Sequence, residues 1–508
     1  MLLSLYVVCS LLLCICVLLW SLERLERNKY RGVPTLPLLP FIGNIHQVLG
    51  DTQNLFHLME NMAAICEQKQ SLCVFWLGPC PILVAQHPDE VKLITNSFVE
   101  KPYFYDFGRS WLGDGLVTAP GYIWKQSIKR LAGTFTSHVV DGYQDVFNVQ
   151  AQKLVINLKT KVGKEPFDIM HMLAFSTLET ICQTALGVSN ISDSIVTEEY
   201  YEAFNRCLEL MVYRGVNVLL HPDAIYRLTP AHREMTKCVA VLHKVSDNVM
   251  KKILLEQKDI NTSKTTGNDS QDKGSKFKAF LEILLEMREI DRNLTDYQIK
   301  SEVDTIILAG QETVATAFFY TLLMIGCKPE VQEKMYAELY SIFGDSKRPV
   351  CKEDLARMSY CEAIINETLR LYPPAPGVMR YADKDLKLKS FTIPKGTICA
   401  INFWGAGRSL QAWGPDAKEY RPERWLEMQP PGNPAAFLPF SYGRRACIGK
   451  KYAMTILKTM LAHCVRELVF ESQAENLQLK VDLALRPVSG HLIQIKLRET
   501  ENCRRQLA

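Results

Sequence analysis

The chain has 508 residues, of which 47% are hydrophobic and 22% charged, so wholesale disorder is excluded. Its length is sufficient to bury a cofactor inside a large core. A formal net charge of +4 does not supply the concentrated basic face that nucleic-acid binding needs, so no nucleic-acid partner is expected. The 16 cysteines form no Cys-x-x-Cys pair, which disfavours a disulfide framework or zinc ribbon and indicates a reduced, cytosol-facing protein.

Residues 1–22 are predicted to form an N-terminal membrane anchor. The run at 2–20 carries no charge and matches the roughly 20 residues that cross a bilayer. A cleaved signal peptide is the alternative, but no basic segment precedes the run and no small-residue cleavage site follows it. Cationic residues come next and place the rest of the chain in the cytosol by the positive-inside rule; they are Arg24, Arg27, Lys29 and Arg31.

Residues 23–45 are predicted to form a basic, proline-rich strap, because its prolines favour an extended backbone. The rest, 46–508, is predicted to be a single domain, mainly α with a minor β part. Strands are expected at 73–78 and 81–86 as a hairpin, and again around 386–401 and 479–497. Helical spacing of apolar residues occurs at 147–163, 232–256, 296–327, 329–344 and 354–372, and the polar segment 258–278 is expected to be a loop.

The longest predicted helix runs from Asp296 to about Cys327. Thr295 and Gln298 form a capping-box pattern at its start, and Pro329 follows its end. A helix of roughly 30 residues is too long for the surface of a small domain. It is therefore expected to pass through the middle of the large one.

The stretch FSYGRRACIG, residues 440–449, surrounds Cys447 in an unusual way. Glycine permits close backbone approach, an arginine two residues before the cysteine can bind a carboxylate, and following N–H groups can hydrogen-bond a thiolate. The helical run after residue 449 also favours a thiolate. A buried thiol at a turn would explain a lone cysteine, but not the spacing Phe-x-x-Gly-x-Arg-x-Cys-x-Gly, formed by Phe440, Gly443, Arg445, Cys447 and Gly449.

This pattern resembles the haem-binding signature of the cytochrome P450 family, and the resemblance covers essentially the whole chain. It implies that family's fold, with a long central helix over the haem. It also implies that the Cys447 thiolate is the axial ligand of haem iron. The expected activity is monooxygenation, in which one atom of O₂ enters a lipophilic substrate and NADPH supplies the electrons.

A second resemblance concerns a buried structural triad. ETLR places Glu367 and Arg370 one helical turn apart, and PERW supplies Arg424. The resemblance implies that these three residues keep the scaffold intact and retain the haem. Taken alone, the spacing of Glu367 and Arg370 favours a surface ion pair, and the PERW segment downstream is what favours the triad.

AGQET, residues 309–313, resembles the family's proton-delivery motif on the central helix. It implies that Glu312 and Thr313 are catalytic and that Ala309 and Gly310 lie at the haem. A threonine in a helix can instead simply donate to the carbonyl one turn earlier. Many relatives in this branch carry a glutamate in place of Ala309, and in some it forms an ester with the haem. Alanine makes that bond impossible, so non-covalent haem b is expected.

Two further positions match haem-propionate contacts of the family. Arg380 follows PPAPGVM, and Trp124 begins a Trp-x-x-x-Arg element. The arginine of that element is Ile128 here, which is a departure from the pattern. The cationic residues close enough in the sequence to replace that arginine are Lys125, Lys129 and Arg130.

The partners implied are NADPH-cytochrome P450 reductase and, as an optional second donor, cytochrome b5, because the chain lacks the glycine motifs of nucleotide sites. A docking face for an acidic partner is one interpretation of the basic residues near the cysteine, and a solvated helix face is the other; they are Arg444, Lys450, Lys451 and Lys458. Resemblance to microsomal fatty-acid ω-hydroxylases and insect enzymes implies the endoplasmic reticulum membrane and a fatty-acid derivative, terpenoid or foreign compound as substrate. The expected apolar lining is Trp111, Leu112, Leu308, Ala309, 377–379 and 488–491, although any of these is also compatible with plain core.

Two other functions stay open from the sequence. A haem-thiolate isomerase or dehydratase needs no reductase, and the intact pair Glu312 and Thr313 disfavours it. A non-catalytic haem or lipid binder is the other, because Ile128 departs from the family pattern.

Overall fold

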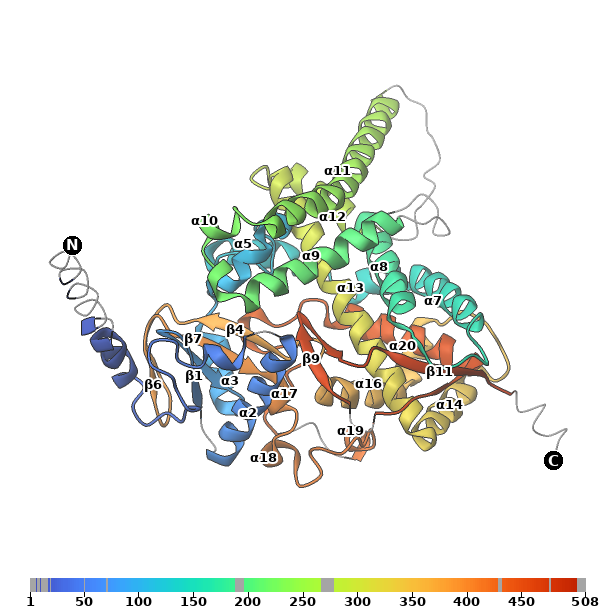
Figure 1. The fold of residues 1–508 in the computed structure, drawn as a ribbon. Coiled ribbons are helices and arrows are strands. Elements are labelled where there is room, and N and C mark those ends of the chain that lie inside the picture. Colours follow the sequence, from blue (N-terminus) through green and yellow to red (C-terminus); the bar gives the residue numbers. More distant parts are fainter. Residues whose placement is uncertain are drawn as a thin grey trace. The chain divides into compact units, whose positions relative to one another are not determined.

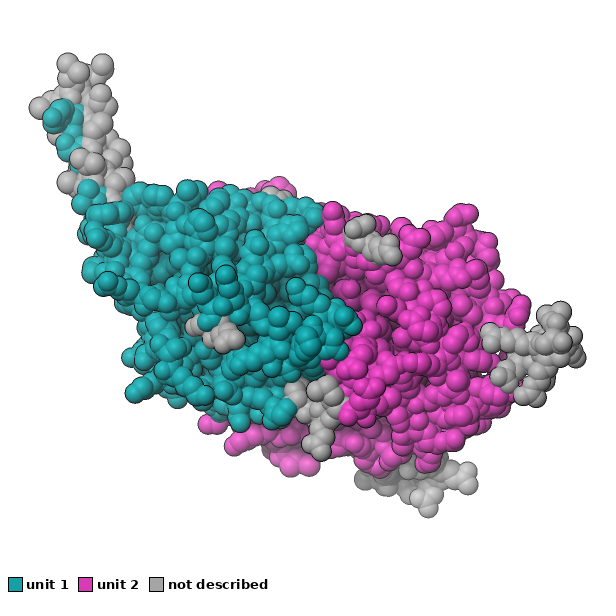
Figure 2. Space-filling view, turned by 90° about the horizontal axis from the view of Figure 1, so that it is seen from below, with its two compact units in different colours: residues 1–102, 376–419, 430–446 teal, residues 103–375, 420–429, 447–508 magenta. Residues whose placement is uncertain are grey.

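The computed structural model describes residues 6, 10, 17–18, 20–49, 51–69, 72–187, 196–265, 278–427, 432–474 and 477–499, without the side chains of 256–265. The chain divides into two compact units, which Figure 1 shows as a ribbon and Figure 2 as coloured surfaces. Unit 1 comprises residues 1–102, 376–419 and 430–446. Unit 2 comprises residues 103–375, 420–429 and 447–508.

Unit 1 is built on a four-stranded sheet in the order β1-β2-β7-β4. β1 (Cys73–Leu77) and β2 (Cys80–Ala85) form the predicted hairpin, whose turn is made by Gly78 at φ +62°. β2 runs parallel to β7 (Ile398–Asn402), which pairs antiparallel with β4 (Gly377–Tyr381). The other elements of this unit are η1 (Ile45–Gln47), α2 (Thr52–Lys69), α3 (Pro88–Ser97), β5 (Leu386–Lys387), β6 (Thr392–Ile393), α17 (Phe403–Ala406), α18 (Leu410–Trp413), η4 (Pro434–Ala436) and η5 (Gly443–Arg445).

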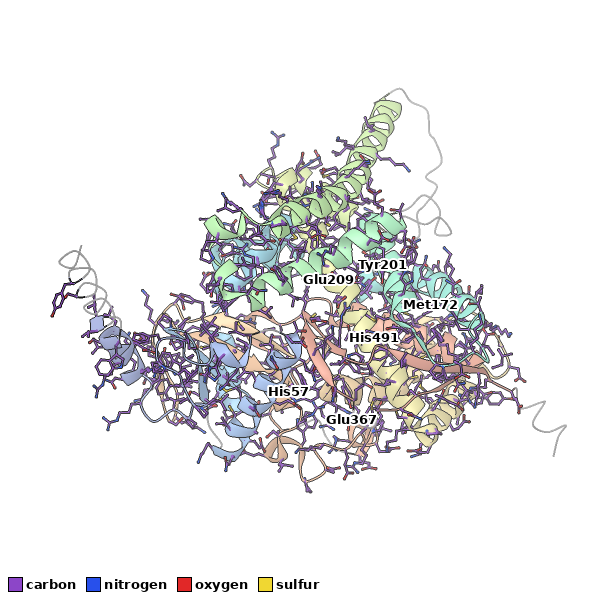
Figure 3. The ribbon with its side chains drawn as sticks, viewed as in Figure 1. His57, Met172, Tyr201, Glu209, Glu367 and His491 are labelled. Atoms are coloured by element: carbon purple, nitrogen blue, oxygen red, sulfur yellow. The ribbon has the colours of Figure 1, made fainter. Side chains whose placement is uncertain are left out.

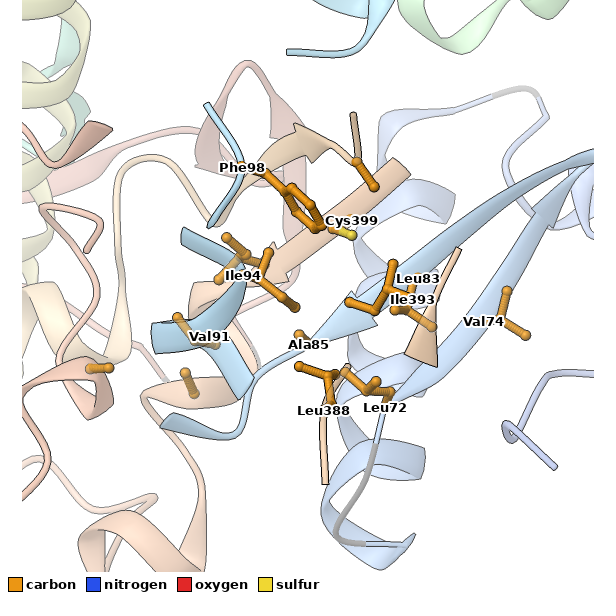
Figure 4. Packing of buried hydrophobic residues seen from close by; sticks show 14 of the residues in the cluster. Leu72, Val74, Leu83, Ala85, Val91, Ile94, Phe98, Leu388, Ile393 and Cys399 are labelled. Carbon is orange, nitrogen blue, oxygen red and sulfur yellow. The ribbon is translucent and has the colours of Figure 1, made fainter. Parts of the chain in front are cut away.

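The core of unit 1 lies between this sheet and α3 (Figure 4). Val91 and Ile94 of α3 and the following Phe98 are fully buried, together with Leu83 of β2 and Cys399 of β7. Because strands covered on both faces have few polar positions, β2 reads as a continuous apolar run rather than an alternating one.

Unit 2 contains most of the helices. They are α4 (Arg109–Leu112), α5 (Gly121–Leu131), α6 (Ser137–Gly142), α7 (Gln144–Lys159), α8 (Met170–Leu186), α9 (Glu198–Val216), α10 (Asp223–Tyr226), α11 (Pro230–Thr265), α12 (Phe280–Ile290), α13 (Asp296–Cys327), α14 (Pro329–Phe343), α15 (Lys352–Arg357), α16 (Ser359–Leu371), α19 (Arg424–Glu427) and α20 (Lys450–Glu467). The short turns are η2 (Tyr103–Gly108) and η3 (Val218–Leu220). The strands form two small sheets, β3 (Phe167–Asp168), β11 (Leu492–Leu497) and β8 (Leu468–Glu471) in one, and β9 (Leu479–Asp482) and β10 (Ala484–Pro487) in the other.

The long helix α13 begins and ends where the sequence predicts. Its capping box is formed, since the Thr295 hydroxyl accepts the N–H of Gln298 at 3.2 Å and the Gln298 side chain accepts that of Thr295 at 3.2 Å. Within the described residues, α13 is the one helix long and apolar enough to cross a bilayer, and 83% of its most apolar window is buried inside the protein. That environment is the one expected for a core helix. The predicted anchor lies largely outside the described residues.

Two sequence predictions about helix ends are wrong. The segment 354–372 is not one helix, because the chain turns at Met358 between α15 and α16. Glu338 of α14 explains the break, since its carboxylate accepts the N–H groups of Tyr360 at 2.6 Å and Cys361 at 2.9 Å and so caps a new helix there. At the other site, α11 continues to Thr265, into the segment predicted as a loop from residue 258.

The loop before α5 is pressed tightly against α13. A Cβ at Gly115 would lie 2.1 Å from the Thr305 hydroxyl and 2.4 Å from the Ser301 carbonyl, so only glycine fits. The next residue, Leu116, donates its backbone N–H to Glu302 at 2.9 Å. Backbone and helix therefore approach each other more closely than any side chain on residue 115 would permit.

Buried carboxylates on α13 make further contacts with neighbouring elements. Asp304 accepts a hydrogen bond from Ser246 of α11 at 2.6 Å and lies 3.4 Å from the ring nitrogen of His243. The same nitrogen donates to the Trp111 carbonyl at 2.8 Å. Burial raises the pKa of Asp304 to about 7 and that of Glu302 to about 7, because the charged form is withdrawn from water.

Gly115→Ala should lower the free energy of unfolding by about 1–3 kcal/mol, since the added methyl group meets backbone as well as side-chain atoms. Urea denaturation of the purified protein measures this change. Gly215→Ala is the matched control: it lies within α9 with open space around its Cβ, and it should stabilise the protein by about 0.5–1 kcal/mol. Equal midpoints for the two variants would contradict the close packing described above.

The raised pKa of Asp304 predicts that stability falls as pH rises. The folded state keeps a proton on Asp304 up to about pH 7, whereas the unfolded chain releases it near the ordinary value of 3.8. The contribution is present below about pH 4 and is lost through pH 7, with a size on the order of 4 kcal/mol. Asp304→Asn should flatten the decline of unfolding free energy between pH 4 and 8, and Asp345→Asn, at an exposed position, should not. Parallel curves for wild type and Asp304→Asn would contradict this.

Candidate functional site

The stretch that precedes Cys447 packs within unit 1. η5 lies against α3, and Gly443 has φ +73°, in the left-handed region that favours glycine. A Cβ there would lie 2.7 Å from the carbonyl oxygen of Thr95. Gly443 is thus required by the contact with α3, which is a different reason from the space around sulfur expected from the sequence. Phe440 is partly buried, as is Arg445.

Cys447 itself is exposed and lies just before α20. Burial by surrounding protein raises the pKa of its thiol, while the N–H of Gly449 and the positive charge of Lys450 lower it. The predicted groups that favour a thiolate are therefore in place, and burial opposes their effect on the pKa. A Cβ on Gly449 would lie 3.8 Å from the sulfur, at ordinary contact distance, so glycine is not required there by that contact.

The other exposed cysteine among the described residues is Cys351. Its sulfur lies 3.1 Å from a carboxylate oxygen of Asp354, and that hydrogen bond raises the pKa of the thiol. Cys351 is thereby committed to the start of α15. The pKa of Cys447 depends on burial, Gly449 and Lys450 and on no acidic group, which distinguishes the two exposed cysteines.

Unit 1 gathers positive charge around Arg380. This residue lies on β4 opposite Cys399 and is 1% exposed. The pKa of Lys101 lies well below its usual range. Burial is the main cause, and the charges of Arg380 and Arg445 add to it. A group of cations of this kind, of which Arg380 is buried and Lys101 and Arg445 are partly buried, is suited to carboxylates. Sequence reasoning found the two arginines but missed Lys101, for which no motif gave a signal.

On α13, Glu312 and Thr313 have different surroundings. Thr313 is exposed, and its hydroxyl donates to the Ala309 carbonyl at 2.7 Å, as the simple helical interpretation of this residue predicts. Glu312 is buried, with its side chain 4% exposed, and accepts a hydrogen bond from Arg486 of β10 at 2.8 Å. Arg486 was missed by the sequence analysis, because no spacing links residues so far apart.

Gly310 has a role within the helix packing of unit 2. A Cβ at this position would lie 2.7 Å from the Ile181 side chain of α8, the helix that lies alongside α13 (Figure 1). The absence of a side chain here serves the close approach of α8 and α13, and the predicted place of Gly310 at the haem stays a prediction.

Glu367 is the centre of a buried polar cluster (Figure 3). Arg370 donates to it twice, at 2.8 and 2.7 Å, and Arg424 lies at 3.4 Å. The Trp425 ring N–H and the Arg421 backbone N–H complete the set, at 3.0 and 2.9 Å. The structure therefore brings the three predicted residues together, and the surface ion-pair interpretation is wrong.

The candidates to replace Ile128 are not equivalent. Trp124 is buried on α5, whereas Lys125 and Lys129 are exposed. Arg130 is bound to Asp291, with nitrogen and oxygen 2.8 Å apart, so it is committed to a contact with the turn after α12.

The structure shows how exposed the residues of the expected docking face and the expected substrate lining are. Lys458 is 7% exposed and bound to Glu362 at 2.8 Å, so it is not part of a docking face, while Arg444, Lys450 and Lys451 are exposed. In the expected substrate lining, Leu112 is buried, and so is Trp111, whose ring packs 5.0 Å from that of Phe204. Burial of these two side chains is compatible with plain core and with a pocket lining, so their place in the lining stays a prediction. Leu308 is buried, and residues 377–379 and Ala309 are partly buried.

Glu367→Gln should destabilise the protein by about 3–5 kcal/mol, because two buried arginines lose the charge that compensates them. Glu209→Gln is the control: this glutamate, also labelled in Figure 3, is bound to Arg206 in an exposed pair and should cost at most about 1 kcal/mol. Denaturation midpoints measure both. If Glu367→Gln cost no more than the control, the cluster would not be the structural centre described here.

The sequence of this chain is similar to those of known proteins. The family model described as "Cytochrome P450" matches residues 33–493. Cytochrome P450 4V2 of Pongo abelii is 33% identical over 483 residues, covering 93% of this chain and 91% of that protein. Cytochrome P450 4c3 of Drosophila melanogaster is 30% identical over 496 residues, covering 95% and 92%. Cytochrome P450 4c21 of Blattella germanica is 31% identical, covering 93% and 95%.

The fold has a counterpart among solved structures. The cytochrome P450DA heme domain superposes with a TM-score of 0.77 at 22% identity, covering 92% of this chain and 98% of that one. This likeness shows the fold, mainly helical with small sheets, and the relatives above show the family. The chain therefore belongs to the cytochrome P450 family and is a cytochrome P450 monooxygenase.

Proposed function

We propose that this monooxygenase binds haem b non-covalently, with the Cys447 thiolate as axial iron ligand, and inserts one atom of O₂ into a lipophilic substrate. The observation that carries the assignment is the setting of Cys447: an exposed cysteine just before α20, where burial raises the pKa of the thiol and the Gly449 N–H and the charge of Lys450 act against that rise. In the cytochrome P450 family a cysteine thiolate is the protein ligand of haem iron.

The donor set of unit 1 fits the two carboxylates of such a haem. Burial and then the charges of Arg380 and Arg445 depress the pKa of Lys101, and a carboxylate partner would relieve the repulsion among these groups. In this proposal Arg380 and Arg445 bind the propionates, and Trp124 takes the place that the family pattern gives it. When bound, the haem supplies the redox centre for O₂ reduction, and its cysteine ligand favours O–O cleavage.

Ala309 supports a non-covalent haem. Its methyl group has no carboxylate to form an ester, so residue 309 contributes no covalent bond to the haem. The smaller side chain also leaves more room over the haem than glutamate would. We infer a pocket for a fatty-acid derivative, a terpenoid or a foreign compound.

Proton delivery is assigned to Glu312 and Thr313. The reaction consumes substrate, O₂, NADPH and one proton, and it gives the hydroxylated or epoxidised product, NADP⁺ and water. Glu312 is the residue that exchanges protons, and the Thr313 hydroxyl, one residue on, relays them. This pair supports the monooxygenase over a haem-thiolate isomerase or dehydratase, which consumes no protons from an acid–alcohol pair.

Partners and location complete the proposal. Residues 1–22 anchor the chain in the endoplasmic reticulum membrane, residues 23–45 form the strap, and 46–508 lie in the cytosol. Electrons come from NADPH-cytochrome P450 reductase, with cytochrome b5 as a second donor. The exposed cations Arg444, Lys450 and Lys451 support a docking face for an acidic partner.

The reduced protein should give the red-shifted Soret band of thiolate-bound haem with carbon monoxide, and Cys447→Ser should abolish it. Two controls should keep the band: Cys351→Ser, which alters the other exposed thiol, and Cys361→Ser, which alters a buried one. A Soret band without the red shift in the wild type would reject Cys447 as the ligand. NADPH consumption with reductase and product analysis would then separate the monooxygenase from a binder.

A further inference from the structure

The ion pair between Glu312 and Arg486 joins the central helix to a strand of unit 2. Arg486 donates through one N–H of its guanidinium group to one carboxylate oxygen, at 2.8 Å. The glutamate side chain is 4% exposed and the arginine 25%. Many ion pairs of the described residues lie at the surface, such as that of Arg206 with Glu209, so a pair this well shielded from water is a stronger constraint.

The other groups around Arg486 leave Glu312 as its main partner. Asp482 of β9 also contributes to the raised pKa of Arg486, but Asp482 is bound to Lys480 at 2.6 Å. Tyr201 of α9, labelled in Figure 3, feels the charges of both Arg486 and Glu312. Burial opposes the charge on Arg486 and Glu312 favours it, and a guanidinium stays protonated throughout the physiological range.

The geometry of a helix explains why an outside partner is needed. Successive residues of a helix point about 100° apart, so Glu312 and Thr313 do not face each other by virtue of their spacing. The Thr313 hydroxyl is already held by the Ala309 carbonyl. The direction of the Glu312 carboxylate must therefore be set from outside α13.

Arg486 occupies only one of the two carboxylate oxygens. The other oxygen of Glu312 is buried and forms no hydrogen bond to the described residues. A permanent cation on one oxygen restrains the carboxylate while the second oxygen stays available to a proton. Rotation of the Glu312 carboxylate away from Arg486 would require the charged contact to break.

We propose that Arg486 is a positioning residue for proton delivery, which holds the Glu312 carboxylate in the direction that oxygen activation needs. This inference rests on the proposed function, because it takes Glu312 as the proton-exchanging group. It adds a residue of the β9–β10 hairpin to the acid and alcohol of α13. Arg486 acts through Glu312 and exchanges no proton itself.

The consequence is visible in how NADPH is used. Both product formation and release of H₂O₂ consume one NADPH and one O₂, but only the first puts oxygen into the substrate. When Glu312 is not held, proton delivery slows. Arg486→Gln should therefore lower the substrate-dependent rate of NADPH consumption about ten-fold, raise the share of H₂O₂, and increase the solvent deuterium isotope effect on turnover.

The variant Arg486→Lys should recover at least half of the wild-type rate. A single N–H contact carries the interaction, so a point charge is an adequate replacement where a two-pronged contact would not be. Arg498→Gln is the matched control, because Arg498 also forms an ion pair with a glutamate of unit 2, at 2.7 Å from Glu333, and lies outside the proposed machinery. It should leave the rate and isotope effect unchanged.

A double-mutant cycle separates positioning from general structure. Glu312→Gln and Arg486→Gln act on one step, so the double variant should be no slower than Glu312→Gln alone. Their effects on the thermal midpoint should likewise be non-additive. Multiplied rate losses, or an Arg486→Gln variant with wild-type rate and isotope effect, would overturn the proposal.

The carbon monoxide spectrum of each variant distinguishes a failure of the Arg486 proposal from a failure of the proposed function. Wild type without the thiolate band would reject the haem-thiolate assignment. Wild type and Arg486→Gln with equal bands, but with unchanged proton delivery, would reject Arg486 alone. If Arg486→Gln does not fold, Arg486→Lys decides: a rate as low as that of Glu312→Gln overturns the proposal, and a recovered rate with the wild-type isotope effect supports it.

Discussion

The constraint on which unit 2 depends is the burial of α13. A helix with apolar neighbours on nearly every side leaves little water for its polar side chains, so its buried acidic side chains are stabilised by partners on other elements. Glu302 accepts a hydrogen bond from the backbone of the loop before α5, Asp304 accepts one from α11, and Glu312 accepts one from β10. The carboxylates that burial would otherwise penalise thereby fix the positions of three segments distant in the sequence.

The same logic governs the cluster at Glu367. One buried carboxylate receives hydrogen bonds from two arginine side chains, one indole and one backbone amide, which together use its acceptor capacity. Because Arg424 and Trp425 come from the segment 420–429, this short piece of chain is tied to α16 by charge as well as by packing. Removing the carboxylate leaves several donors without an acceptor at once.

The sequence predicted elements and residue types more reliably than partners. The hairpin, α13 with its capping box, and the union of Glu367 with Arg370 and Arg424 follow from local spacing or motif order. The break at Met358 depends on Glu338 of another helix, and no local pattern contains it. Arg486 and Lys101 were missed for the same reason. Lys458 was misjudged because the sequence shows a lysine after the cysteine, but not the face of α20 that the core covers.

The departure at Ile128 has a physical account in the charges of unit 1. Two propionates carry two negative charges, and Lys101, Arg380 and Arg445 already bring three cationic groups together. Burial and then the charges of the two arginines depress the pKa of Lys101, so further positive charge would add to the electrostatic repulsion among these groups. Arg130, the one arginine near the missing position, is bound to Asp291 instead. An isoleucine at residue 128 is therefore compatible with haem retention under the proposed assignment, because the compensating charge comes from another part of the sequence.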